Sequence, residues 1–252
     1  MSKLHVDRIS STLEETFKDI IDLSDLKNKS ERDVRNSFLS RSLAAYILMH
    51  RARIDRKTAA SAVIDGYNDN GIDAIYFDRG ELLVYIVQSK WKYDGKSSPD
   101  LGSIRNFISG FKDLIDGEFS RFNEKFSKMK EDLSEALYNA KAAFILIIAY
   151  TGNEPISRDG KRAIQDVLKE LNEPISLPLA SYEIYGLADI YKAISGAADG
   201  AHIKLDVMLR NWGHIESPYP AYYGQIDAAD VVDWWETYST HLFAPNLRKF
   251  LG

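Results

Sequence analysis

The chain has 252 residues, 45% of them hydrophobic, no cysteine and a formal net charge of −5. Its length and hydrophobic content fit one large globular domain or two small ones. The lack of cysteine excludes disulfides, cysteine-based zinc sites and thiol nucleophiles. No run approaches the ~20 apolar residues of a membrane span, and the N-terminal residues lack the apolar stretch of a signal peptide. We therefore expect a cytoplasmic protein with no membrane partner.

The negative charge is unevenly placed along the chain. Residues 205–236 hold six acids and one base, so the remaining chain is neutral overall. The net charge argues against indiscriminate binding of nucleic acids, but it permits a local basic groove beside Lys90 and Lys92.

The N-terminal part is predicted to be helical. Apolar residues at helical spacing predict a helix over residues 9–23. A second helix, largely buried, is expected over residues 31–50, with Ser30 as its cap and Asp33 as the capping-box partner. A short helix is expected over residues 58–64.

Two strands are predicted next, over residues 72–78 and 82–90. Side chains in a strand alternate between its two faces, so Gln88 and Lys90 point the same way. Pairing of the two strands as a hairpin would bring Asp73 beside both of them.

The remaining patterns complete the expected order of elements. They predict a loop over 93–100, a helical region over 103–138 broken or bent at Gly117, a strand over 142–150, a helix over 158–172, a strand over 180–185 and an irregular aromatic loop over 211–223. This order predicts an α/β fold with a mixed sheet flanked by helices.

The residues at the hairpin suit a site for a hard divalent cation such as Mg²⁺ or Mn²⁺, which prefers oxygen ligands. Asp73 supplies one oxygen, the side-chain carbonyl of Gln88 a second, and the backbone carbonyl of Ser89 a third. Lys90 is placed to hold or deprotonate an attacking water and to offset phosphate charge.

Each of these residues also has a simpler interpretation. Asp73 could close the bend at Gly71, Lys90 could extend to solvent from a strand end, and Gln88 could be a polar strand-end residue. We favour the metal site because an acid faces a glutamine and a lysine two residues apart.

Asp69 and Glu31 are further candidates. Asp69 could add an outer-shell or second-metal contact, although it shares with Asp65 a turn-rich loop in which aspartates occur for backbone reasons. Glu31 could reach the site from the start of a helix, where capping and the helix dipole also explain an acid.

The order Gly71-Ile72-Asp73, strand, hairpin, strand, Gln88-Ser89-Lys90 resembles the PD-(D/E)XK nuclease superfamily, in the Mrr-like version where glutamine replaces an acid. More narrowly, four segments look like the amino-terminal part of abortive-infection phage-resistance (AIPR) proteins. They are Phe38–Leu48, Val63–Asp78, Val84–Trp91 and Leu242–Gly252. The resemblance implies a restriction-endonuclease-like core that hydrolyses DNA with Mg²⁺ or Mn²⁺ and serves in phage defence. Neutral Gln88 should hold a cation more weakly than an acid would.

With this resemblance, the chain is expected to contain three parts. Residues 1–57 form a helical part packed on the core, residues 58–190 the nuclease-like α/β core, and residues 191–252 an aromatic and acidic extension that leads toward a missing C-terminal region. The alternative function is a non-catalytic module that binds DNA or a protein. RNA is an alternative substrate, because no residue pattern in the sequence indicates whether a 2′-hydroxyl is recognised. Paired cleavage of a duplex would favour a homodimer.

Overall fold

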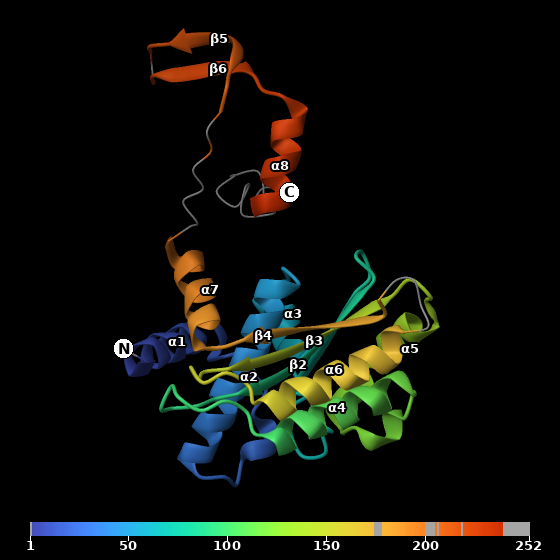
Figure 1. Cartoon of the computed structure of the whole chain (residues 1–252). Helices are drawn as coiled ribbons and strands as arrows, with labels where there is room; N and C mark the ends of the chain where they lie inside the picture. The colour runs from blue at the N-terminus through green and yellow to red at the C-terminus, as the bar shows by residue number, and fades with distance from the viewer. Residues whose placement is uncertain (1, 174–177, 200–204, 206, 218, 239–252) are drawn as a thin grey trace. The chain divides into compact units, whose positions relative to one another are not determined.

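The structure is a computed structural model that describes residues 2–173, 178–199, 205, 207–217 and 219–238. The chain divides into two compact units, Met1–Ile194 and Ser195–Gly252. Figure 1 traces the helices and strands of each.

The larger unit is built on a four-stranded sheet in the order β1-β2-β3-β4. The strands are β1 (Ala74–Asp78), β2 (Leu83–Lys90), β3 (Ala143–Tyr150) and β4 (Ala180–Tyr185). β1 and β2 form an antiparallel hairpin, whereas β2, β3 and β4 run parallel to one another. The sheet is therefore mixed, and the C-terminal ends of its three parallel strands lie at one edge.

Helices cover both faces of this sheet (Figure 1). The first face carries α1 (Ser2–Phe17), α2 (Glu31–Arg51), α3 (Arg56–Ser61) and α7 (Leu187–Asp199), and the second carries α4 (Leu101–Ile115), α5 (Lys130–Tyr138) and α6 (Arg158–Asn172). Successive residues of β2 alternate between the two cores, with Tyr85 packing on the first and Val84 and Ile86 on the second. The predicted α/β fold, a mixed sheet flanked by helices, is confirmed.

Short 3-10 helices complete the unit. They are η1 (Ser24–Leu26), η2 (Phe119–Arg121) and η3 (Glu124–Met129). The expected helical region over 103–138 is interrupted where α4 ends, because Gly117 adopts a positive φ of 74° just beyond the helix.

The first two helices differ in how well the sequence predicted them. α2 begins as predicted, with the Ser30 hydroxyl accepting from the Asp33 backbone N–H at 3.2 Å. α1, by contrast, spans residues 2–17 and not the predicted 9–23. Its buried stripe continues upstream through Val6 and Ile9, and the apolar pair at 20–21 lies beyond the helix end.

The smaller unit contains β5 (Arg210–Ile215), β6 (Ala221–Gln225) and α8 (Ala228–Tyr238). The two strands pair antiparallel, so the prediction of an irregular loop over 211–223 is wrong. Within β5, Gly213 lies against the ring of Tyr223, where a side chain would clash. Leu242–Gly252, one of the segments that resemble AIPR proteins, lies outside the described residues. Within the described part of the chain, no helix is both long and apolar enough to cross a membrane.

Candidate metal centre

Asp73 precedes β1 and meets the C-terminal end of β2. Its backbone N–H donates to the Val87 carbonyl at 2.9 Å, and its buried Oδ2 accepts from the Ser89 backbone N–H at 2.6 Å. The Ser89 hydroxyl lies 3.0 Å from the same oxygen. The hairpin therefore brings Asp73 to the end of β2, where its carboxylate contacts Ser89, whereas the strand pattern predicted Gln88 and Lys90 as its neighbours.

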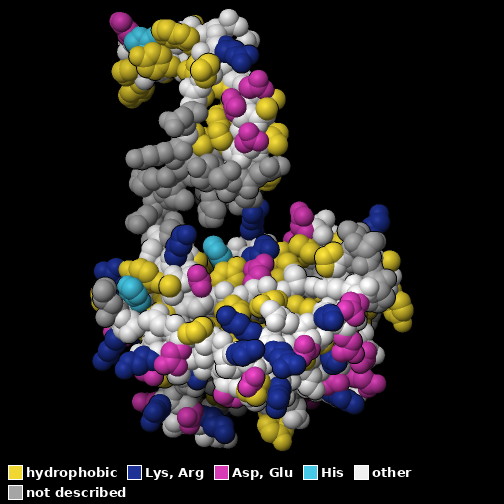
Figure 2. Space-filling model, viewed as in Figure 1, with side chains coloured by type: hydrophobic (Ala, Val, Ile, Leu, Met, Phe, Trp, Pro, Cys, Tyr) yellow, Lys and Arg dark blue, Asp and Glu magenta, His cyan; other side chains and the backbone are white. Residues whose placement is uncertain are grey.

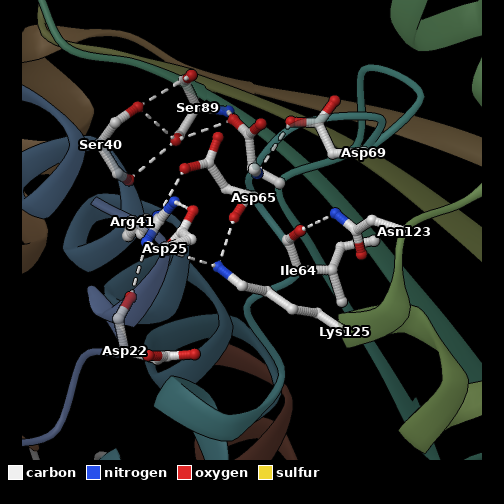
Figure 3. A network of polar contacts seen from close by, with 12 residues as sticks. Asp22, Asp25, Ser40, Arg41, Ile64, Asp65, Asp69, Ser89, Asn123 and Lys125 are labelled. Carbon is white, nitrogen blue, oxygen red and sulfur yellow. Dashed lines mark hydrogen bonds and ion pairs between the residues drawn. The ribbon is translucent and has the colours of Figure 1, made fainter. Parts of the chain in front are cut away.

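Two more aspartates join Asp73. One carboxylate oxygen each from Asp65, Asp69 and Asp73 lies within 4.8 Å of the others. The loop between them closes because the backbone N–H groups of Ile64 and Asp65 both donate to the Asp73 carbonyl, at 2.8 and 3.1 Å. Asp69 accepts from the Gly71 N–H at 2.8 Å. Figure 3 shows Asp65 and Asp69 in the same network as Arg41 and Ser89. We call Asp65, Asp69 and Asp73 the aspartate cluster.

Burial and mutual repulsion disfavour negative charge on the carboxylates of the cluster. Burial and the charge of Asp65 together raise the pKa of Asp73 to about 7, although the Lys90 ammonium lowers it. Burial also raises the pKa of Asp69, although hydrogen bonds from glycine N–H groups and the charge of Lys90 act in the other direction. A cation bound among the three carboxylates would relieve this repulsion.

Lys90, the last residue of β2, is half-buried and close enough to affect both acids. Its proximity to Asp73 matches the arrangement expected from the sequence. The lysine supplies a positive charge beside carboxylates that would otherwise be uncompensated.

Gln88 lies next to the cluster but is held mainly by backbone groups. Its Nε2 donates to the carbonyls of Gly71 and Ser103, both at 3.1 Å. Its Oε1 is buried and has no hydrogen-bond partner among the described residues. Buried acceptors are normally satisfied, so this oxygen lacks the hydrogen bond that a buried carbonyl usually has.

Glu31 is not brought into the cluster. It is exposed in the first turn of α2 and lines a separate groove with Glu14 and Arg35. Ser40, which contacts Ser89, lies nine residues further along the helix, so a rise of ~1.5 Å per residue places Glu31 about 14 Å away along the axis.

Sequence reasoning missed Arg41, whose side chain is 1% exposed. The guanidinium donates to both carboxylate oxygens of Asp25 and to Asp65 Oδ2, all at 2.7 Å (Figure 3). This pairing holds the pKa of Asp25 at about 2. Lys125 donates to the Asp65 carbonyl at 2.8 Å. The available signal was a single charged residue, an arginine, inside the helical segment Phe38–Leu48. A buried arginine has to be paired.

An open cleft of about 720 Å³ reaches the cluster at Asp65. Its walls come from the segment after α1, from α2, from the loop after Asp65 and from η3. The lining residues are Asp22, Ser24, Asp25, Leu26, Lys29, Ser37, Arg41, Asp65, Gly66, Tyr67, Asn123, Glu124 and Lys125.

Comparisons of the chain with protein-family models, with curated proteins and with solved structures gave no match. The geometry of the aspartate cluster, Lys90 and the cleft is therefore the basis for a functional proposal.

Proposed function

We propose that this chain is a Mg²⁺- or Mn²⁺-dependent endonuclease domain that hydrolyses phosphodiester bonds in DNA. The observation that carries the proposal is the convergence of three aspartate carboxylates beside Lys90 at the end of a strand hairpin. Carboxylates in this number suit a hard cation, and a lysine beside them suits a reaction at a phosphate.

The donor set fits such a cation. The aspartate cluster would hold it through side-chain oxygens. The sequence adds two oxygen donors, the Ser89 carbonyl, which accepts from the Ser40 hydroxyl at 3.3 Å, and the unpaired Gln88 Oε1. A bound Mg²⁺ or Mn²⁺ stabilises charge on the phosphate and lowers the pKa of a bound water. Lys90 would position that water and offset phosphate charge.

Two further features support the proposal. The chain order of hairpin, α4, β3, α6 and β4 is compatible with a restriction-endonuclease-like core. Figure 2 shows Lys and Arg side chains, interspersed with Asp and Glu, on the face where α4 and α6 lie, and the exposed cations of these helices include Arg105 and Lys161. Such cations suit a phosphate backbone. The resemblance to AIPR proteins extends the proposal to phage defence.

A non-catalytic module that binds DNA or a protein is the second candidate. One observation favours it: Asp73 and the Gln88 amide already have hydrogen-bond partners inside the protein. These contacts give both residues a structural role that needs no metal.

The test is cleavage of supercoiled plasmid and single-stranded DNA with Mn²⁺, Mg²⁺ or EDTA. We expect metal-dependent cutting that Asp73→Ala and Lys90→Ala each reduce by about 100-fold or more. Lys141→Ala is a matched control, because Lys141 is exposed and precedes β3 at the opposite edge of the sheet. Cutting by both site variants at the parent rate would refute the assignment, and an inactive parent would favour the binding module.

A further inference from the structure

Tyr67 is the most exposed aromatic residue beside the aspartate cluster. Its side chain is 90% exposed, and it lines the cleft that opens at Asp65. It lies two residues from Asp65 and two from Asp69, which limits each Cα separation to about 7 Å. The core does not use this ring, so the ring is available to contact a ligand that enters the cleft.

The charges of the cleft indicate what kind of contact that is. Its acids are Asp22, Asp25, Asp65 and Glu124, and its bases are Lys29, Arg41 and Lys125. Two of the acids, Asp25 and Asp65, are already paired with Arg41 (Figure 3). Nearly balanced charge gives little net attraction for phosphates, so affinity in the cleft has to come from contacts with bases.

The size of the cleft points to an unpaired strand. A volume of about 720 Å³ is that of a small-molecule site, and such a site admits a nucleotide or two. In a duplex the base faces are covered by their neighbours, whereas an unpaired base offers a face to an exposed ring.

We propose that Tyr67 stacks on an unpaired base of single-stranded DNA, next to the phosphate that lies at the aspartate cluster. The inference rests on the endonuclease function proposed above and names its substrate class. Tyr67 then selects single-stranded over duplex DNA, while the aspartate cluster and Lys90 carry the reaction.

The test measures binding of a short labelled single strand and of the matching duplex by fluorescence anisotropy. Ca²⁺ replaces Mg²⁺, and gels verify that the DNA stays intact. We expect the parent to prefer the single strand and Tyr67→Ala to weaken that binding on the order of 10-fold, since one stacked base is worth ~1–3 kcal/mol. Tyr67→Phe keeps the ring and should bind as the parent does. Tyr138→Ala is the matched control, because Tyr138 is 93% exposed at the end of α5.

The outcomes separate this inference from the nuclease proposal. If Tyr67→Ala binds and cuts single-stranded DNA as the parent does, stacking is refuted and the nuclease proposal stands. If the parent cuts nothing but binds single-stranded DNA through Tyr67, the nuclease proposal fails and stacking stands. A parent that prefers duplex DNA, or binds only RNA, overturns the choice of single-stranded DNA.

Discussion

The carboxylate of Asp73 accepts a hydrogen bond from the backbone N–H of Ser89 at 2.6 Å, which ties the start of β1 to the end of β2. This bond favours the ionised acid, yet burial outweighs it and raises the pKa of Asp73 to about 7. The nearby carboxylates act in the same direction as burial. The protein therefore places a carboxylate where its charge is unfavourable without a cation.

The first prediction concerns the stability of the metal-free protein as pH changes. Because the pKa of Asp73 is higher in the folded than in the unfolded chain, the folded state retains a proton that the unfolded state has released. The free energy of unfolding should therefore fall as pH rises from about 4 to about 7, and then level off. In Asp73→Asn, this decrease in the free energy of unfolding should be smaller by about 1–3 kcal/mol.

Urea denaturation in EDTA between about pH 5 and 8 measures this effect. Asp166→Asn is the control, because Asp166 is exposed on α6 and pairs only loosely with Arg162, at 3.9 Å. It should keep the parent's pH dependence. A parent whose stability is flat over this range contradicts the prediction.

The second prediction concerns metal binding. Mn²⁺ should raise the melting temperature of the parent, by an amount that grows with the metal concentration, because it binds the folded state preferentially. Asp69→Asn and Asp73→Asn should each abolish most of the shift, since each removes a charged oxygen ligand. Asp166→Asn should preserve it. Equal shifts in all four proteins would show that the ion binds elsewhere.

Strand patterns predicted much of this fold and part of the site. The alternation of side chains along a strand predicted which residues of β2 face each core. Pairing of the two predicted strands correctly placed Asp73 beside the end of β2. The place of Asp65 could not be predicted in this way. It depends on backbone hydrogen bonds that close the loop onto the Asp73 carbonyl, and those are invisible in a residue pattern.

Helix placement explains the other differences. The Gln88 amide donates to Ser103, so its role depends on where α4 begins against the sheet, which alternation does not determine. Arg41 pairs with Asp25 and Asp65 from distant parts of the chain. Glu31 lies in the first turn of α2, as predicted, but the length of α2 separates it from the cluster.

The third prediction concerns the buried guanidinium of Arg41. Arg41→Met keeps most of the volume but leaves Asp25 and Asp65 without their partner, so it should destabilise the protein by about 3–5 kcal/mol. It should also weaken Mn²⁺ binding, because Arg41 fixes one oxygen of Asp65. Urea denaturation and calorimetric titration measure the two effects.

Arg35→Ala is the matched control for Arg41. Arg35 pairs with Glu14 at 2.6 Å on the surface of the same helix, and both side chains are substantially exposed. Exposed pairs contribute about 1 kcal/mol or less. If the two substitutions have equal effects, the buried network is not important for stability.

The fourth prediction concerns the contact of α4 with the loop of the aspartate cluster. A Cβ added at Gly110 would lie 2.0 Å from the Asn70 carbonyl oxygen, a backbone atom that cannot move alone. Asn70 is also held by Asp113 through a hydrogen bond of 2.8 Å. Gly110→Ala should therefore push the loop and α4 apart, cost about 1–3 kcal/mol of stability, and weaken Mn²⁺ binding because Asp69 is the adjacent residue.

Gly102→Ala separates this contact from a general effect of alanine in α4. A Cβ at Gly102 would lie 3.0 Å from Asp100 Oδ1, the end of a side chain that has to shift by only a few tenths of an ångström. This control should change stability by less than about 1 kcal/mol and leave Mn²⁺ affinity unchanged. Denaturation and calorimetry on both variants decide the point: if Gly110→Ala behaves like Gly102→Ala, then α4 does not position the aspartate cluster. If only Gly110→Ala weakens Mn²⁺ binding, the close approach of α4 and the loop keeps Asp69 near Asp73.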